Sequence, residues 1–303
     1  MAEPVLLSTL DMARFVADGF LRFDGLVPPE LNDAAMLELE QLKDFAPFEG
    51  NPLRPRSGTP LADCWPNDSA IRQIYDLPVL AGAIRSLVGD DPIYDHQFCH
   101  YIPSGSQGFQ DLHCDAAIDS FDPTFDIQVF YFPRALAPGA GGTRFVPGSH
   151  LRMVHENSVA RYQHIVGEQF YAGEAGTVLI FHHGLWHAGQ ANPSDDDRWM
   201  FKVRINPSER QVRKWDTSDY DAATSGNWDH MFATMAQEET VASHLRRAHP
   251  WTVAGQDRLD TIQRVSLWRY LSGDDEFDVD WYHTRTERRA ALLEDALLED
   301  GSR

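Results

Sequence analysis

The feature that most constrains this chain is the pair His113 and Asp115, which are separated by a single residue. Alternate side chains of a β-strand point to the same face, so the imidazole and the carboxylate are expected to lie side by side. A second histidine, His187, closes an apolar, strand-like run further along the chain. Two imidazoles and one carboxylate form the facial triad that holds non-haem Fe(II) and leaves positions open for a co-substrate and O₂. We therefore predict that His113, Asp115 and His187 bind iron.

The bulk composition narrows the range of partners. With 303 residues, 43% of them hydrophobic, the chain has ample material for a core. A net charge of -20 argues against a nucleic-acid partner, which needs clustered Lys and Arg, and against an anionic membrane surface. The three cysteines, Cys64, Cys99 and Cys114, form no CxxC pair. With no secretory signal and no apolar run of membrane-spanning length, we expect a cytoplasmic protein that acts on a small molecule.

Helical patterns flank a central region of short β-like runs. Before residue 91 the spacing predicts helices over 8–19, 28–43 and 78–88, a strand over 20–23, and a long surface loop over 46–68, which is rich in Pro, Gly and Asn. After residue 207 it predicts helices over 256–271 and 284–298. The central runs, which alternate with Gly- and Pro-containing turns, are Ile93–Ile102, Gly108–His113, Ile127–Phe132, Thr143–Val146, Gln169–Ala172, Thr177–Phe181 and Trp199–Ile205.

Many short strands at this spacing predict an antiparallel sandwich or barrel. No linker of flexible composition interrupts the chain, so we expect one domain over residues 1–303. In that domain a mainly β core, residues 91–207, would carry a helical N-terminal flank, residues 1–90, and a helical C-terminal extension, residues 208–303.

Three further features support a site around the His-x-Asp pair. A short strand and Pro-Gly turn, residues 141–150, lie between the two parts of the proposed triad. Arg198 follows a turn that would bring it alongside the His187 strand, where a guanidinium could grip a carboxylate bidentately. Lys202 or Arg204 could bind the carboxylate in place of Arg198. The aromatic run Ile127–Phe132 offers an apolar lining, although Phe130 and Tyr131 point to opposite faces and only one of them can line a pocket.

Other histidines compete with the proposed ligands. His182 and His183 are rivals of His187, but we interpret them as the exposed end of a strand. We expect His150 to tie down its own turn. We interpret His96, His100, His155 and His164 as structural or as lying near a substrate opening.

Together these pieces resemble the phytanoyl-CoA dioxygenase family of Fe(II)- and 2-oxoglutarate-dependent oxygenases. The matching segments cover residues 8–205: Asp18-Gly-Phe20, His113-x-Asp115, Gly142–His150, Trp186-His187 and Arg198. The resemblance implies a double-stranded β-helix (jelly-roll) core and iron held by His113, Asp115 and His187. It also implies that Arg198 pairs with the distal carboxylate of 2-oxoglutarate, with Thr143 a weaker candidate for a hydrogen bond to it. Gly189 departs from the family pattern, because many members place a small hydroxylated residue there.

The resemblance implies a dioxygenase that uses Fe(II), 2-oxoglutarate and O₂ to hydroxylate, or otherwise oxidise, an unactivated C–H bond of a small organic substrate. Natural-product scaffolds are among the substrates of the family. Asp115 favours oxygen transfer, because the halogenases of the family lack a carboxylate at that position. One alternative is another metal enzyme on a cupin-like barrel, either a dioxygenase without 2-oxoglutarate or a Zn hydrolase. A non-catalytic binding protein is the other.

Overall fold

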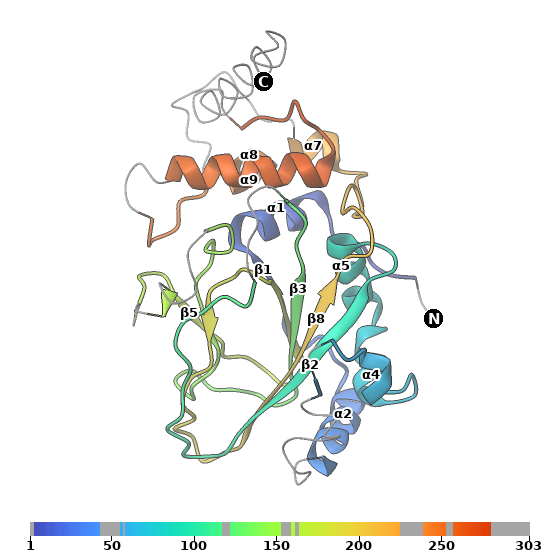
Figure 1. Cartoon of the computed structure of the whole chain (residues 1–303), viewed down its shortest axis with the longest axis vertical. Coiled ribbons are helices and arrows are strands. Elements are labelled where there is room, and N and C mark those ends of the chain that lie inside the picture. Colours follow the sequence, from blue (N-terminus) through green and yellow to red (C-terminus); the bar gives the residue numbers. More distant parts are fainter. Residues whose placement is uncertain are drawn as a thin grey trace.

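The computed structural model describes residues 3–42, 55–56, 58–116, 122–152, 159–160, 164–224, 239–252 and 257–279. Within them two antiparallel sheets form the centre of the molecule (Figure 1). The larger sheet has the strand order β1-β6-β3-β8-β2 and the smaller one β5-β4-β7. The strands are β1 (Phe20–Phe23), β2 (Ile93–Ile102), β3 (Ile127–Phe132), β4 (Arg144–Phe145), β5 (Gln169–Phe170), β6 (Thr177–His182), β7 (His187–Ala188) and β8 (Arg198–Asn206).

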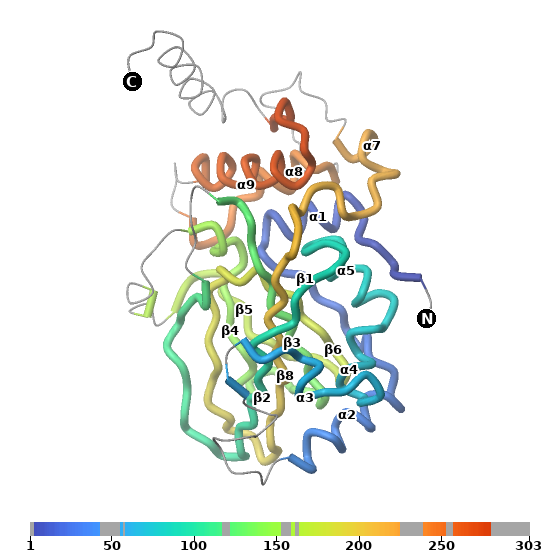
Figure 2. The backbone as a smooth tube through the Cα atoms, turned by 45° about the vertical axis from the view of Figure 1, so that its right-hand side comes forward, coloured from blue at the N-terminus to red at the C-terminus, as the bar shows by residue number. Residues whose placement is uncertain are grey.

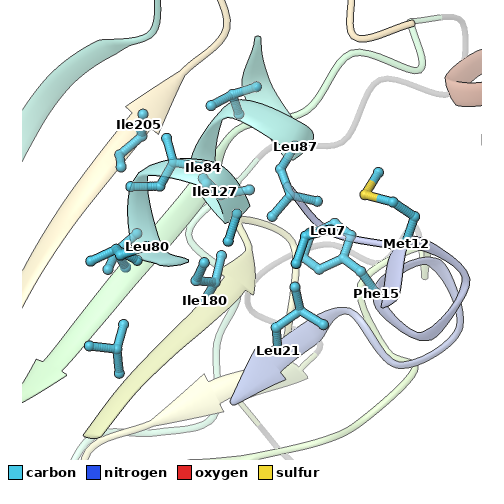
Figure 3. Close-up of a cluster of buried hydrophobic side chains, with 14 of the residues drawn as sticks. Leu7, Met12, Phe15, Leu21, Leu80, Ile84, Leu87, Ile127, Ile180 and Ile205 are labelled. Carbon is cyan, nitrogen blue, oxygen red and sulfur yellow. The ribbon is translucent and has the colours of Figure 1, made fainter. Parts of the chain in front are cut away.

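The inner strands β3 and β6 of the larger sheet are buried on both faces, and the alternation of their side chains separates the two faces. One face carries Val129, Tyr131 and Ile180, which pack in a large core with the N-terminal helices. Figure 3 shows part of this core, where Met12 and Phe15 lie close to Leu7, on the same side of the cluster as Leu87. This packing explains why β3 and β6 are mainly apolar.

The opposite face of the larger sheet turns toward the smaller sheet. Phe130, Phe132 and Met200 from the larger sheet join Phe145 and Tyr171 from the smaller side in one buried cluster. Two antiparallel sheets that pack face to face in this way form a jelly roll. The mainly β, cupin-like core expected from the sequence is therefore confirmed.

Helices cover one side and one end of the larger sheet. In Figure 2, α2, α4 and α5 run along one side, while α8 and α9 lie across the end near α1. The helices are α1 (Thr9–Asp18), α2 (Pro29–Gln41), α3 (Leu61–Cys64), α4 (Ala70–Tyr75), α5 (Pro78–Val88), α7 (Tyr220–Thr224), α8 (Val241–Leu245) and α9 (Asp257–Ser272). None of the helices in these described ranges is long and apolar enough to cross a bilayer.

The ends of α1 show how local sequence sets an element. Ser8 accepts a hydrogen bond from Asp11 N–H, and the Asp11 side chain accepts one from Ser8 N–H, which completes a capping box. Gly19 ends the helix with a φ of 78°, a left-handed conformation that favours glycine. A Cβ on Gly19 would lie 2.4 Å from Nδ1 of His150, so the packing also requires a glycine there.

Two expectations about the elements need correction. Part of the loop predicted over 46–68 is the short helix α3, and α4 was not anticipated. The run Gly108–His113 is not a strand, because it has only an isolated β-bridge, at His113. The helix predicted over 284–298 lies outside the described residues, whereas that over 256–271 corresponds to α9.

Candidate metal centre

His113, Asp115 and His187 meet on the inner side of the jelly roll. Each offers one ligand atom, and the three atoms lie within 4.8 Å of one another. Backbone pairing brings the histidines together, because an antiparallel bridge joins His113 to His187, the first residue of β7. Asp115 follows two residues later, in a bend beyond the bridge, and its Oδ1 atom lies 3.4 Å from His113 Nε2.

Both imidazoles turn the same ring nitrogen toward the cluster. His113 Nδ1 lies 2.8 Å from the Asp111 carbonyl oxygen, and His187 Nδ1 lies 2.9 Å from that of Leu185. A carbonyl can only accept, so each Nδ1 carries the proton and each Nε2 is left with a free lone pair. This second hydrogen bond on a histidine is a common feature of metal-ligating imidazoles. The donor set of two Nε2 atoms and a carboxylate fits Fe(II).

The charges of the cluster follow from burial and from one another. Burial lowers the pKa of His187 to about 4, so its imidazole is neutral at physiological pH. Burial alone would also lower the pKa of His113, but the Asp115 carboxylate and the Asp111 carbonyl stabilise the protonated ring, and together they raise the pKa. Burial acts to raise the pKa of Asp115, yet His113, His187 and Lys202 together hold it far below its ordinary value. Asp115 is therefore a carboxylate.

The cluster forms part of the wall of a cavity of about 410 Å³, within the usual range for small-molecule sites. Arg198, at the start of β8, and Thr143, just before β4, line the same cavity. The guanidinium of Arg198 donates from Nη2 to the Gln190 carbonyl at 2.6 Å and from Nη1 to that of Ala191 at 3.3 Å. Burial lowers its pKa to about 10, which still leaves it cationic at neutral pH. The rest of the wall combines aromatic, basic and small polar residues and includes His96, Phe98, His100, Phe130, Phe132, Met200 and Lys202.

The structure thus brings the five residues singled out from the sequence to one cavity. Of their rivals, His182, His183 and Arg204 do not line it, whereas Lys202 does. His182 and His183 are not the exposed end of a strand: they are only 6% and 8% exposed. His182 is stacked against Phe125, and His183 pairs with Asp126. The prediction of exposure was wrong because the segment after β6 is covered by α1 and by the chain that leads into β3.

Three other assignments are settled by contacts. His150 is fully buried, and its Nε2 lies 3.2 Å from the Val16 carbonyl, so its ring contacts α1. Arg204 forms a two-pronged ion pair with Asp95 and does not line the cavity. Phe130 lines the cavity, while Tyr131 points to the helical side, as the alternation required.

Sequence reasoning missed two residues that contact Asp115. Gln128 on β3 and Lys202 on β8 both donate to its Oδ2 atom. Strand alternation could have indicated both residues. Gln128 lies on the same face of its strand as Phe130, and Lys202 lies on the same face as Arg198. The register of β3 and β8, which places the two strands side by side, is what makes them converge.

The fold and this cluster define a class: jelly-roll proteins that carry a His-x-Asp pair and a distal histidine on the inner face. Comparison with known families makes the assignment specific. The model of the phytanoyl-CoA dioxygenase (PhyH) family matches residues 15–200, which is more than half of the chain. The protein therefore belongs to the phytanoyl-CoA dioxygenase family. No curated protein sequence matches the chain.

Solved structures share the fold at low sequence identity. EctD from S. alaskensis, crystallised with 2-oxoglutarate and 5-hydroxyectoine, is 18% identical with a TM-score of 0.53 over 68% of this chain and 78% of EctD. The epimerase SnoN, in complex with Fe3+, alpha ketoglutarate and nogalamycin RO, is 18% identical with a TM-score of 0.52 over 66% of this chain and 84% of SnoN. EvdMO1 is 18% identical with a TM-score of 0.51 over 65% of this chain, which spans 49% of EvdMO1.

Proposed function

We propose that this protein is an Fe(II)- and 2-oxoglutarate-dependent oxygenase that hydroxylates a C–H bond of a small organic molecule. The observation that carries the proposal is the convergence of two Nε2 atoms and a carboxylate on a cavity that also contains Arg198. Membership of the phytanoyl-CoA dioxygenase family supports it. So does the presence of 2-oxoglutarate in the structure of EctD, and of alpha ketoglutarate with iron in that of SnoN.

In this proposal His113, Asp115 and His187 hold the iron. When bound, iron with 2-oxoglutarate and O₂ supplies the oxidation of a C–H bond, coupled to decarboxylation of 2-oxoglutarate to succinate and CO₂. Arg198 grips the distal carboxylate of the co-substrate, and its hydrogen bonds to two backbone carbonyls orient the guanidinium for that contact. Thr143, which is 7% exposed on the same wall, offers its hydroxyl to 2-oxoglutarate.

The cavity wall contributes by excluding water. Phe98, Phe130 and Phe132 line the space next to the cluster. An apolar wall limits the access of water and of reductants to an oxidising centre. The cavity volume of about 410 Å³ limits the substrate to a small molecule or to the reactive end of a longer one.

A metal-dependent enzyme of another class, such as a Zn hydrolase, is the second candidate, because the same three ligands can hold Zn²⁺ with one open position. Arg198 favours the first candidate. A half-buried guanidinium in the cavity, paired only with backbone carbonyls among its hydrogen bonds described above, favours an anion beside it, and a dicarboxylate co-substrate supplies one.

The test is an anaerobic titration of the apo-protein with Fe(II) and then 2-oxoglutarate. We expect a weak visible absorption band that needs both components and is absent in Asp115→Ala. After admission of O₂ we expect iron-dependent succinate. A protein that gives no such band and releases no succinate, yet hydrolyses an ester with Zn²⁺, would establish the second candidate.

A further inference from the structure

Two side chains outside the proposed ligand set converge on one oxygen of Asp115. Gln128 donates from Nε2 to Asp115 Oδ2 at 2.6 Å, and Lys202 donates from Nζ to the same atom at 3.0 Å. A carboxylate oxygen has two lone-pair sites, so these two donors engage both. The other oxygen, Oδ1, lies 3.4 Å from His113 Nε2 and accepts from neither of these donors, whereas Oδ2 lies 3.6 Å from His187 Nε2.

The backbone around Asp115 explains why such support is needed. His113 is held by its bridge to His187, but Asp115 lies beyond that bridge and outside every strand of the described residues. Its side chain is 25% exposed, so packing encloses it only in part. Gln128 and Lys202, by contrast, sit on neighbouring strands of the larger sheet, which is the most regular part of the fold.

Gln128 occupies its position at a cost to folding. The residue is 1% exposed, and its Oε1 atom has no hydrogen-bond partner in the described part of the chain. A buried polar atom without a partner destabilises the folded state. An apolar residue of similar volume would avoid this cost. The presence of the amide is therefore better explained by its Nε2 atom, which donates to Asp115.

We propose that Gln128 is a positioning residue that, with Lys202, holds Oδ2 of Asp115 so that this carboxylate binds the metal through Oδ1 alone. The inference rests on the proposed metal site. Its consequence is functional, because a carboxylate that binds through one oxygen leaves free a coordination position that a chelating carboxylate would fill. A chelating co-substrate and O₂ both need such positions.

The decisive variant is Gln128→Met, which removes the donor with little change in volume or charge. Gln97→Met is the matched control: Gln97 is also 1% exposed with an unpartnered Oε1, but its Nε2 faces the Pro60 carbonyl at 3.4 Å. Lys202→Met is less informative, because it removes a hydrogen bond and also a positive charge that repels the ion.

Two measurements distinguish an effect on metal binding from an effect on stability. They are the melting temperature of the metal-free protein and the Kd for Ni(II), determined by calorimetry. We expect both glutamine variants to melt at or above the wild-type temperature. Only Gln128→Met should bind Ni(II) more weakly, by roughly 10-fold, the lower end of the effect of losing a hydrogen-bond partner of a metal ligand. The visible band of the Fe(II)–2-oxoglutarate complex should also shift in Gln128→Met and stay in place in Gln97→Met.

The outcomes are distinguishable. Wild-type protein that binds neither Ni(II) nor Fe(II) would overturn the proposed function and this inference with it. Tight wild-type binding that Gln128→Met leaves unchanged, or that Gln97→Met weakens equally, would overturn the inference alone. If the methionine variant fails to fold, Gln128→Leu, which also lacks the donor, is measured in its place with the same criteria.

Discussion

His113 and His187 exchange both of their backbone hydrogen bonds. His113 N–H donates to the His187 carbonyl at 3.0 Å, and His187 N–H donates to the His113 carbonyl at 2.8 Å. Residues directly opposite in such an antiparallel pair present their side chains on the same face, and the two imidazole centroids lie 4.6 Å apart. The backbone pairing therefore brings the two proposed nitrogen ligands together without help from a metal ion.

Removal of a proposed ligand should abolish metal binding and leave the fold intact. For His113→Ala we expect at least a ~100-fold loss of Ni(II) affinity, because even the partners of metal ligands contribute 10–100-fold. The control is His164→Ala, since the His164 side chain is 83% exposed and pairs with Glu168. Calorimetry with circular dichroism as a check on folding measures this, and wild-type affinity in His113→Ala would contradict the ligand assignment.

Arg198 should determine the affinity for 2-oxoglutarate and not that for the metal. Charge-assisted hydrogen bonds of about 1.5–3 kcal/mol are lost in Arg198→Met, so the KM for 2-oxoglutarate should rise roughly 10- to 100-fold. Arg198→Lys should recover only part of this, because an ammonium cannot form the two-pronged contact. Arg204→Met serves as the control, as Arg204 pairs with Asp95 outside the cavity. A KM that is unchanged in Arg198→Met would remove the assigned role.

Acidification should destabilise the protein through buried neutral histidines. Burial lowers the pKa of His182 to about 3 and that of His150 well below its ordinary value. The unfolded chain, with histidine pKa values near 6.5, then binds more protons than the folded one. The stability contribution of each residue is thus complete above about pH 6.5 and declines toward the folded-state pKa, by roughly 1.4 kcal/mol per pH unit for each group.

Urea unfolding at several pH values between neutrality and about pH 5 measures this loss of stability. His182→Asn removes one of the titrating groups and keeps an acceptor for Gly184 N–H, which His182 Nδ1 binds at 3.0 Å. The variant should therefore show a shallower dependence of unfolding free energy on pH. A slope equal to that of the wild type would show that His182 is not the group responsible.

A substitution on the helical face of β3 should lower the stability of the protein and leave its metal affinity unchanged. Tyr131, on the helical side, donates its hydroxyl to Asn32 Oδ1 at 2.8 Å in the buried core. Tyr131→Phe leaves that oxygen without its donor and should cost about 1–3 kcal/mol of unfolding free energy. Ni(II) affinity should not change, because the residue faces away from the cavity. A variant that loses metal affinity at unchanged stability would contradict this division of the strand.

Local sequence patterns were sufficient for the elements that depend on neighbouring residues. The strand predicted over 20–23 and the helix over 78–88 have the observed bounds, as do Ile93–Ile102 and Ile127–Phe132. Caps, turns and the alternation of apolar residues act over a few positions, so one sequence carries enough information to place them. The His-x-Asp pair was expected on a strand, but the structure has only a β-bridge at His113 and a bend at Asp115.

Only the tertiary structure decided which distant groups meet. Burial of His182 and His183 depends on how α1 packs over the end of β6, and the two donors on Asp115 depend on the register between β3 and β8. Periodicity reports that residues share a face, but it does not report what covers that face or which strand lies next to it. Those facts arise from the packing of segments far apart in the chain, where many weak contacts are satisfied together and no short stretch determines the result.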